Sequence, residues 1–178
     1  MHRQTSVAGT PIARRALSLQ LTPLDPLVRG AVRSLRHESS VRTVDWRIGD
    51  LGDVACDPEL VRYVFVELLT NALRYSQDRD PAVIEVGQAR LKDEQVFFVR
   101  DNGLGFDMRE ADKWFDGFRR LRDVDSVDTA RGLATVDAVV RKHGGRLWTQ
   151  AEPGVGATFF FTLGALVPGI ASSAQSSR

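Results

Sequence analysis

The chain lacks several features that mark particular classes of protein. Its 178 residues include a single cysteine, Cys56, which excludes an internal disulfide and a cysteine metal cluster. The formal net charge of +1 creates no field that would attract nucleic acid or an anionic membrane. No apolar run approaches the ~20 residues of a transmembrane helix, and the first residues lack the apolar core of a secretion signal. We therefore expect a cytoplasmic protein with no membrane span.

The composition is that of a folded domain with polar ends. Hydrophobic residues make up 43% of the chain and charged residues 26%, as in soluble globular proteins. The length is enough for one domain with a substantial core. We expect this domain at residues 24–165, preceded by a partly disordered segment at 1–23 and followed by a disordered tail at 166–178.

Hydrophobic periodicity predicts three long helices and five strands. Asp25, as a candidate N-cap, and Pro26 open the first helix, and Asp57-Pro58 open the second. The helices are expected at 22–38, 58–76 and 132–144, and the strands at 41–50, 82–91, 95–101, 146–152 and 156–164. Helices segregated on one face of a mixed, mostly antiparallel sheet indicate an α+β fold, a two-layer α/β sandwich.

Two polar side chains interrupt the apolar helix expected at 58–76. Glu67 and Asn71 are four residues apart, so they share one face of that helix. Burying an unpartnered polar group costs roughly 2–7 kcal/mol, against a total stability of roughly 5–15 kcal/mol. Either the two side chains lie on a solvated stripe, or a polar ligand meets them.

A loop with two glycines follows the strand expected at 95–101. Asp101 heads the stretch DNGLG, in which Gly103 and Gly105 allow the backbone to turn tightly. DNG by itself is a common turn. Its position directly after a strand is what makes this stretch informative.

These stretches resemble motifs of the histidine-kinase catalytic domains, members of the Bergerat-fold ATPases that include gyrase B and MutL. The resemblance covers roughly residues 24–165, and the motifs occur in the family's order. They are ELLTNALRYS like the N box, DNGLGFD like the first glycine box, KWFDGFRRL like the phenylalanine-rich box, RGLATVDAVVRKHGG like the end of the second glycine box, and GVGATFFFTLG like the closing strand. DNGLGFDMREADKWF is most similar to kinases of the bacteriophytochrome type.

The resemblance implies a domain that binds ATP or ADP together with Mg²⁺. Asn71 matches the asparagine with which family members hold the metal. Glu67 matches the residue that positions or deprotonates the attacking group, or holds a metal-bound water. Arg74 stands where the family more often has a lysine near phosphate, and Tyr75 follows it.

The resemblance also implies how the base is recognised. Asp101 matches the aspartate that accepts a hydrogen bond from the adenine amine, often with a water shared by a threonine of the last strand, here Thr158. Thr158 can equally be read as an ordinary strand threonine. Positions in the two glycine boxes complete the expected nucleotide site: Gly103, Gly105, Gly132 and Leu133.

Histidine kinases transfer the γ-phosphate of ATP to a histidine on a dimerisation hairpin, from which a response regulator receives it. This chain contains His2, His37 and His143. His37 is followed by Glu38, as in the acceptor motif, but it falls inside the catalytic domain, and His143 is read as a helix cap before Gly144-Gly145. Residues 1–23 resemble the end of the hairpin and its linker. The resemblance therefore implies an acceptor supplied in trans or by a missing N-terminal hairpin.

The lid over the phosphates departs from the family pattern Gly-x-Gly-x-Gly-Leu. Asp128 and Ala130 replace two of the glycines, and Gly132 remains. A carboxylate about 4 Å from a phosphate is repelled by roughly 4 kcal/mol at an effective dielectric near 20. Two alternatives stay open: a degenerate regulatory domain that docks on a kinase or a response regulator, and an anti-sigma-type serine kinase. The bacteriophytochrome-like stretch argues against the second.

Overall fold

Five strands form one mixed sheet, in the order β2-β4-β5-β7-β6, in this computed structural model. The structure describes residues 16–36, 42–109 and 127–164, with the backbone alone described at 127–131. A parallel pairing joins β2 to β4, the other neighbours in this sheet are antiparallel, and β1 pairs with β3 in a separate two-stranded sheet. The elements are β1 (Gln20–Pro23), α1 (Leu24–Leu35), β2 (Val44–Ile48), β3 (Asp53–Cys56), α2 (Pro58–Tyr75), β4 (Ala82–Leu91), β5 (Glu94–Asp101), α4 (Val127–Lys142), β6 (Leu147–Glu152) and β7 (Gly156–Phe161).

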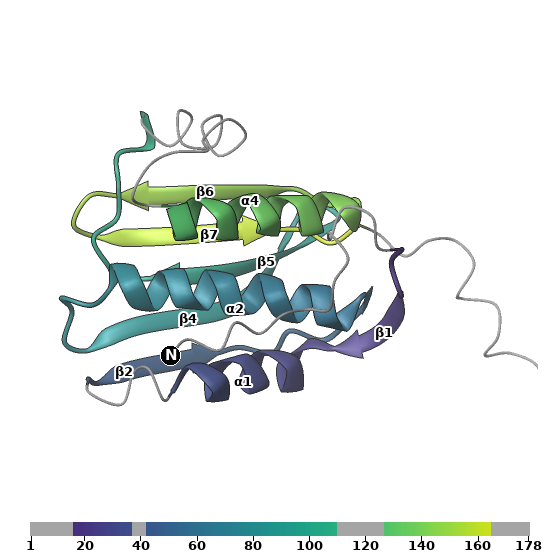
Figure 1. Cartoon of the computed structure of the whole chain (residues 1–178), viewed down its shortest axis with the longest axis horizontal. Coiled ribbons are helices and arrows are strands. Elements are labelled where there is room, and N and C mark those ends of the chain that lie inside the picture. Colours follow the sequence, from purple (N-terminus) through teal and green to yellow (C-terminus); the bar gives the residue numbers. More distant parts are fainter. Residues whose placement is uncertain (1–15, 37–41, 110–126, 165–178) are drawn as a thin grey trace, which may run out of the picture.

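Helices α1, α2 and α4 lie side by side on one face of the five-stranded sheet (Figure 1). Helix α2 runs over the middle strands, with α1 on the β2 side and α4 on the side of β6 and β7. This arrangement confirms the predicted α+β two-layer sandwich with a mixed, mostly antiparallel sheet. No helix in the described ranges is both long and apolar enough to cross a membrane.

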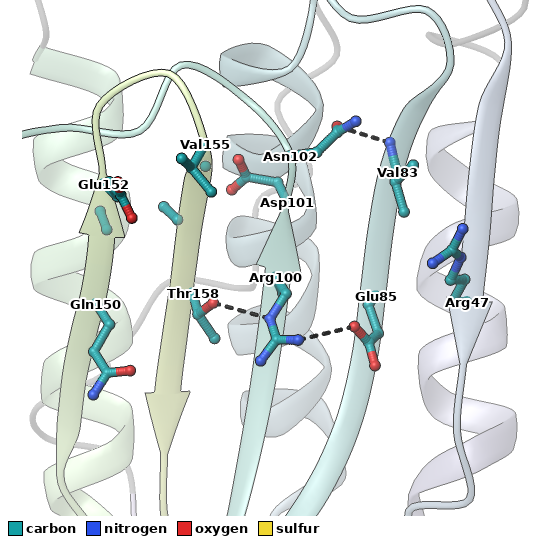
Figure 2. Close-up of a pocket in the computed structure, with 13 residues that line it drawn as sticks. Arg47, Val83, Glu85, Arg100, Asp101, Asn102, Gln150, Glu152, Val155 and Thr158 are labelled. Atoms are coloured by element: carbon teal, nitrogen blue, oxygen red, sulfur yellow. Dashed lines mark hydrogen bonds and ion pairs between the residues drawn. The ribbon is translucent and has the colours of Figure 1, made fainter.

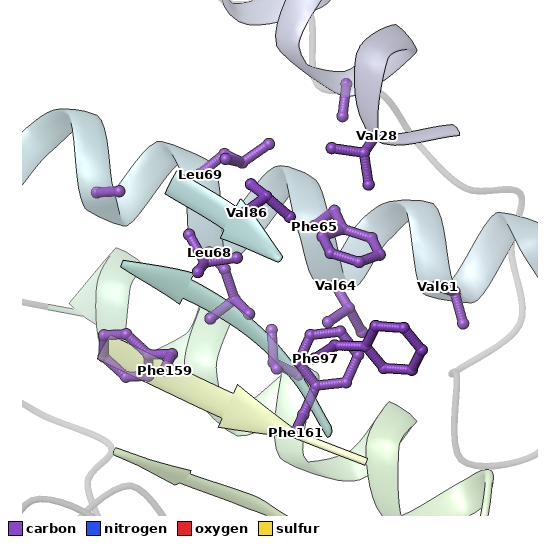
Figure 3. Close-up of a cluster of buried hydrophobic side chains, with 14 of the residues drawn as sticks. Val28, Val61, Val64, Phe65, Leu68, Leu69, Val86, Phe97, Phe159 and Phe161 are labelled. Atoms are coloured by element: carbon purple, nitrogen blue, oxygen red, sulfur yellow. The ribbon is translucent and has the colours of Figure 1, made fainter. Parts of the chain in front are cut away.

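Helix α2 packs at the centre of the helical layer because most of its circumference is apolar. Asp57 is its N-cap and accepts the Leu60 N–H at 3.2 Å, and a proline follows, as the sequence predicts. Phe65 meets Phe161 of β7 edge-on, with ring centroids 5.4 Å apart (Figure 3). The other buried side chains of α2 are Leu60, Val61, Val64, Leu68, Leu69, Asn71, Ala72 and Leu73.

The first helix differs from the prediction at its start. It begins at Leu24 with Pro23 at the N-cap position, so the prediction of Asp25 as the N-cap is wrong. The Asp25 carboxylate instead accepts the backbone N–H of Leu51 at 3.1 Å and ties α1 to the segment before β3. The Asp25 carboxylate therefore accepts from a backbone N–H that is distant in the sequence, instead of from the first turn of its own helix.

Other differences concern short elements and helix ends. Strands β1 and β3 are not predicted by the sequence, since each has four residues and little alternation. Helix α4 begins at Val127 rather than at Gly132, which places the altered lid positions Asp128 and Ala130 in its first turn. The phenylalanine-rich box, His2, His37 and the predicted tail lie outside the described residues.

A buried histidine joins the end of α4 to the start of α2. His143 Nε2 accepts the Asp57 N–H at 3.1 Å, and Nδ1 donates to the Val139 carbonyl, 2.8 Å away, in the last turn of α4. The Asp57 carboxylate also accepts the backbone N–H of Ser18 at 3.1 Å. His143 therefore satisfies a helix-end carbonyl, as predicted, and clamps the end of α4 to the N-terminus of α2, while the Asp57 carboxylate holds the segment before β1.

We expect His143→Ala to lower the free energy of unfolding by about 2–4 kcal/mol, because the buried Asp57 N–H loses its partner and a cavity opens. Urea unfolding should show a lower midpoint with an unchanged slope. Arg62→Ala, at an exposed position of α2, is the control and should change stability by less than about 0.5 kcal/mol. Equal midpoints for the two variants would contradict the clamp.

Candidate functional site

Asn71 is buried inside the helical layer. Its side chain is 4% exposed, and its amide nitrogen Nδ2 has no hydrogen-bond partner among the described residues. Buried amides are nearly always hydrogen-bonded, and leaving one unpaired costs about 1–3 kcal/mol. A solvated stripe is therefore excluded for Asn71. A flip of its carboxamide would exchange the places of the oxygen and the nitrogen, so either atom can be the one left without a partner.

Glu67 lies one turn before Asn71, half-buried between α2 and α4. The backbone of α4 approaches so closely at Gly132 that a Cβ there would clash with Glu67 Oε2. Tyr63 forms side-chain hydrogen bonds with Glu67 and with Thr135 of α4. Burial, and next the Glu67 charge, raise the pKa of Tyr63 to about 12, so its hydroxyl keeps the proton that it donates to the carboxylate. Gly132 thus has a packing role: it lets α4 lie against Glu67.

The C-terminal end of α2 touches the DNGLG loop. The Leu104 N–H donates to the Tyr75 carbonyl at 3.0 Å, and a Cβ at Gly103 would clash with the same carbonyl. Gly105 has φ +61°, and a Cβ there would clash with the Glu152 carbonyl. Close backbone contact therefore requires both glycines, and it joins the C-terminal end of α2 to the loop.

Asp101 ends β5 with a carboxylate directed into the protein. The residue is 6% exposed, and its carboxylate accepts the Gly103 N–H at 2.8 Å and the Ala157 N–H of β7. Burial raises the pKa of Asp101 above its ordinary 3.8, and the two backbone hydrogen bonds oppose that rise. An ionised carboxylate has about four acceptor sites, so one held in this way can still accept from an amine.

The structure does not bring Thr158 to Asp101. Ala157 lies opposite Asp101 in the β5–β7 pairing, and Thr158 lies opposite Arg100. Because successive side chains of a strand point to opposite faces, Thr158 faces away from the helices. Its hydroxyl accepts from Arg100 Nε at 3.2 Å (Figure 2). This geometry favours the ordinary strand threonine, and the β7 residue that meets Asp101 is Ala157, through its backbone.

The remaining predicted site residues differ in their exposure to solvent. Arg74 and Tyr75 are in the last turn of α2 and are exposed, Tyr75 to 38%. Leu133 is 5% exposed and belongs to the hydrophobic core, so it does not line an open site. Among the predicted residues, Glu67 and Gly132 meet between α2 and α4, and Asn71 lies on α2 one turn after Glu67. Gly103 contacts the end of α2 next to Asp101.

A hollow of about 560 Å³ lies on the open face of the sheet, opposite the helices (Figure 2). Its floor is one row of residues in register across the five strands: Arg47, Glu85, Arg100, Thr158 and Gln150. Arg100 donates to both Glu85 and Thr158, so the central groups of this row satisfy one another. Asp101 also lines the hollow, whereas Glu67 and Asn71 do not, so the hollow reaches Asp101 but not the two polar residues of α2.

The side chains of the α2 site suit Mg²⁺ held by one or two protein ligands. They do not suit a metal that is bound by side chains alone. The described ranges hold no group of three or more His, Cys, Asp or Glu side chains that could bind a metal. Mg²⁺ usually takes only one or two ligands from protein and the rest from phosphates and water. A buried carboxamide whose nitrogen has no partner within the described ranges, as at Asn71, suits that arrangement once it presents its oxygen to the ion.

The sequence motifs miss three residues that shape this region: Tyr63, Arg79 and Ala157. Ala157 is recoverable from strand alternation, since it shares the core-facing side of β7 with Phe159 and Phe161. Tyr63 has a similar signal, because it precedes Glu67 by one helical turn. Arg79 has no local signal, since its side chain bonds to carbonyls at positions 103 and 154.

Residues 56–166 match the family model described as histidine kinase-, DNA gyrase B-, and HSP90-like ATPase. Cyanobacterial phytochrome A of Nostoc sp. is 32% identical over 158 residues, which are 88% of this chain and 20% of that protein. The methanogenesis regulatory histidine kinase FilI of Methanothrix harundinacea is 41% identical over 110 residues, 62% of this chain and 12% of that protein. The chain thus spans a fifth or less of these curated relatives.

Solved structures share the fold. The nucleotide-free catalytic domain of histidine kinase ThkA aligns with a TM-score of 0.66 at 17% identity, over 82% of this chain and 95% of that one. Full-length ShkA in complex with AMPPNP gives 0.65 at 19% identity, over 85% and 33%. The match to the family model covers more than half of the chain, including α2, the DNGLG loop and β7. The chain therefore belongs to the histidine kinase-, DNA gyrase B- and HSP90-like ATPases, as an ATP-binding domain of the histidine-kinase type.

Proposed function

We propose that this chain is the catalytic domain of a cytoplasmic two-component sensor histidine kinase. It transfers the γ-phosphate of ATP to a histidine supplied in trans or by a dimerisation hairpin, and a response regulator takes the phosphoryl group from there. The observation that carries the proposal is the buried side chain of Asn71, whose amide nitrogen has no hydrogen-bond partner among the described residues, one turn after Glu67 on the helix that touches the Asp101 loop. The relative FilI is named a histidine kinase, which supports the same reaction.

Each site residue has a defined task in this reaction. The bond between the γ-phosphorus and the bridging oxygen of ADP breaks, and a phosphorus–nitrogen bond forms on the acceptor imidazole. Glu67, with Tyr63 donating to it, orients the imidazole or takes its proton. The Asp101 carboxylate accepts from the adenine amine. Asn71 would be the protein ligand of Mg²⁺, an ion that neutralises charge on the phosphate oxygens.

Calorimetric titration with ATP and ADP, with and without Mg²⁺, tests the binding half of the proposal. Incubation with γ-labelled ATP and the isolated dimerisation hairpin of a relative such as FilI tests the transfer. We expect acid-labile label on the hairpin and none on this chain alone. A chain that binds neither nucleotide would end the proposal.

The altered lid favours one rival, a degenerate regulatory domain that docks on a kinase or a response regulator. Asp128 and Ala130 stand in the first turn of α4, where the family pattern has glycines. Nucleotide binding without transfer to any hairpin would support this rival. The anti-sigma-type serine kinase is disfavoured, because the relatives compared above carry phytochrome and histidine-kinase names.

Asp101→Asn should weaken ADP binding by about 1.5–3 kcal/mol, because a charged acceptor facing the adenine amine is lost. The ionised form of Asp101 is the one that binds, and burial raises its pKa. Wild-type affinity should therefore fall as the pH drops from neutral through that raised pKa, sooner than for an exposed aspartate. Calorimetry over this pH range checks both effects, and the variant controls for titration of the ligand. Equal affinities at neutral pH would remove Asp101 from the site.

Asn71→Leu should separate metal binding from packing. The nucleotide-free domain should be as stable as the wild type or more so, by up to about 2 kcal/mol, since a buried unpaired amide is replaced by an apolar group of similar size. The gain in ATP affinity that Mg²⁺ gives the wild type should vanish. Urea unfolding and titrations with and without Mg²⁺ measure the two effects. A magnesium-dependent gain that survives in the variant would exclude Asn71 as the ligand.

The altered lid should limit the phosphate end of the site. We expect the wild type to bind ATP and ADP with similar, weak affinity, and Asp128→Gly with Ala130→Gly to strengthen ATP while leaving ADP nearly unchanged. Both substitutions must be tested in one variant, because the effects of neighbouring substitutions on binding free energy need not be additive. Ala138→Gly, at an exposed position of α4, is the control for the roughly 1 kcal/mol that glycine costs in a helix. If the double variant binds ATP no more tightly than the wild type, the altered lid does not limit phosphate binding. The rival reading as a degenerate regulatory domain then loses its main support.

A further inference from the structure

One arginine side chain reaches both segments that frame Asp101. Arg79, in the connection after α2, donates from Nη2 to the Gly103 carbonyl at 3.1 Å and to the Gly154 carbonyl in the β6–β7 turn. The Gly154 N–H in turn donates to the Leu104 carbonyl at 2.6 Å. Arg79, the DNGLG loop and the β6–β7 turn therefore form a closed ring of hydrogen bonds.

The peptide group between Gly103 and Leu104 is held at both ends. Its oxygen accepts from Arg79, and its N–H donates to the Tyr75 carbonyl at 3.0 Å. Because a peptide group is planar, two opposed hydrogen bonds set its orientation. The neighbouring N–H of Gly103 donates to the Asp101 carboxylate at 2.8 Å. Arg79 is thus linked to the Asp101 carboxylate through Gly103 alone.

Arg79 is itself anchored to the end of α2. Its backbone N–H donates to the Ser76 carbonyl at 3.1 Å, and the Ser76 hydroxyl donates to the Ala72 carbonyl at 2.6 Å. Arg42 donates to the same Ser76 carbonyl at 2.7 Å and to the Leu73 carbonyl, and a cation is favourable at this end of a helix. The ring is therefore built on the best-packed helix of the domain.

We propose that Arg79 is a positioning residue for adenine recognition, which holds the Gly103–Leu104 peptide group so that the Asp101 carboxylate meets the base. This inference rests on the proposed nucleotide site. Both acceptors of Arg79 belong to segments that flank Asp101, so its effect falls on the base and not on the phosphates. It is the same for ADP and ATP, and it does not depend on Mg²⁺.

The test compares Arg79→Met and Arg79→Lys in the whole chain. Methionine keeps a long side chain without donors, and lysine keeps a charged donor with a different geometry. Titration should give a Kd about tenfold higher for both ADP and ATP in Arg79→Met, partial recovery in Arg79→Lys, and an unchanged effect of Mg²⁺ in both. Arg47→Met removes an exposed arginine, paired with Asp45, from the open face of the sheet and should keep the wild-type Kd.

Hydrogen exchange without nucleotide supplies a second readout. The amides of Leu104 and Gly154 should exchange faster in Arg79→Met than in the wild type, while amides in the middle of α2 keep their protection. Wild-type affinity in Arg79→Met overturns the inference and leaves the proposed function standing. A general loss of protection that Arg79→Lys does not restore assigns Arg79 a merely structural role and also overturns it. A wild type that binds no nucleotide removes the proposed function, and the inference falls with it.

Discussion

Helix α2 must bury apolar side chains around most of its circumference, and that requirement sets the positions of the other elements. Phe65 and Leu68 pack into the core formed with the sheet, and α1 and α4 cover the flanks of the helix. Full burial of one such side chain is worth about 1.5–3 kcal/mol, more than the roughly 0.5–1.5 kcal/mol of a typical neutral hydrogen bond. One stripe of α2 carries Glu67 and Asn71 into this apolar setting. The site therefore lies where the packing of α2 brings α4 and the DNGLG loop against that stripe.

The two polar residues of the stripe differ in their hydrogen bonding within the folded chain. Glu67 is supported by Tyr63, whose hydroxyl also meets Thr135 on the neighbouring helix. Asn71 is buried more deeply than Glu67, yet its amide nitrogen has no partner among the described residues. A ligand that satisfies this group binds the folded state and not the unfolded one, so it stabilises the domain by mass action. The unpaired amide thus destabilises the ligand-free domain, and only a bound ligand that pairs with it removes this cost.

Sequence patterns predict the parts of this domain that depend on local spacing. The apolar run and the Asp57-Pro58 cap are enough to place α2, and alternation places β4, β5 and β7. The patterns fail where a partner that is distant in the sequence determines the local structure. Asp25 looks like a cap, but its carboxylate bonds to Leu51, and β1 and β3 exist because each pairs with the other. Tyr63 and Ala157 follow from the periods of helix and strand once their neighbours are known, whereas Arg79 follows from no local pattern.

The two ends of the proposed nucleotide site differ in how they are held. The base end is a ring of hydrogen bonds built on α2 and two turns, in which Gly103 and Gly105 are needed for close backbone contact. The phosphate end begins at the first turn of α4, where Ala130 favours helix over the open backbone that a glycine lid allows. Lengthening a helix at its N-terminus ties up carbonyls but leaves the first amides free, so an anion can still be met there. Asp128 is a residue of that turn, so the sequence adds a negative charge where the family pattern has a glycine. In the proposed site the phosphates would then approach a residue of their own charge sign, whereas the adenine amine would meet an acceptor at Asp101.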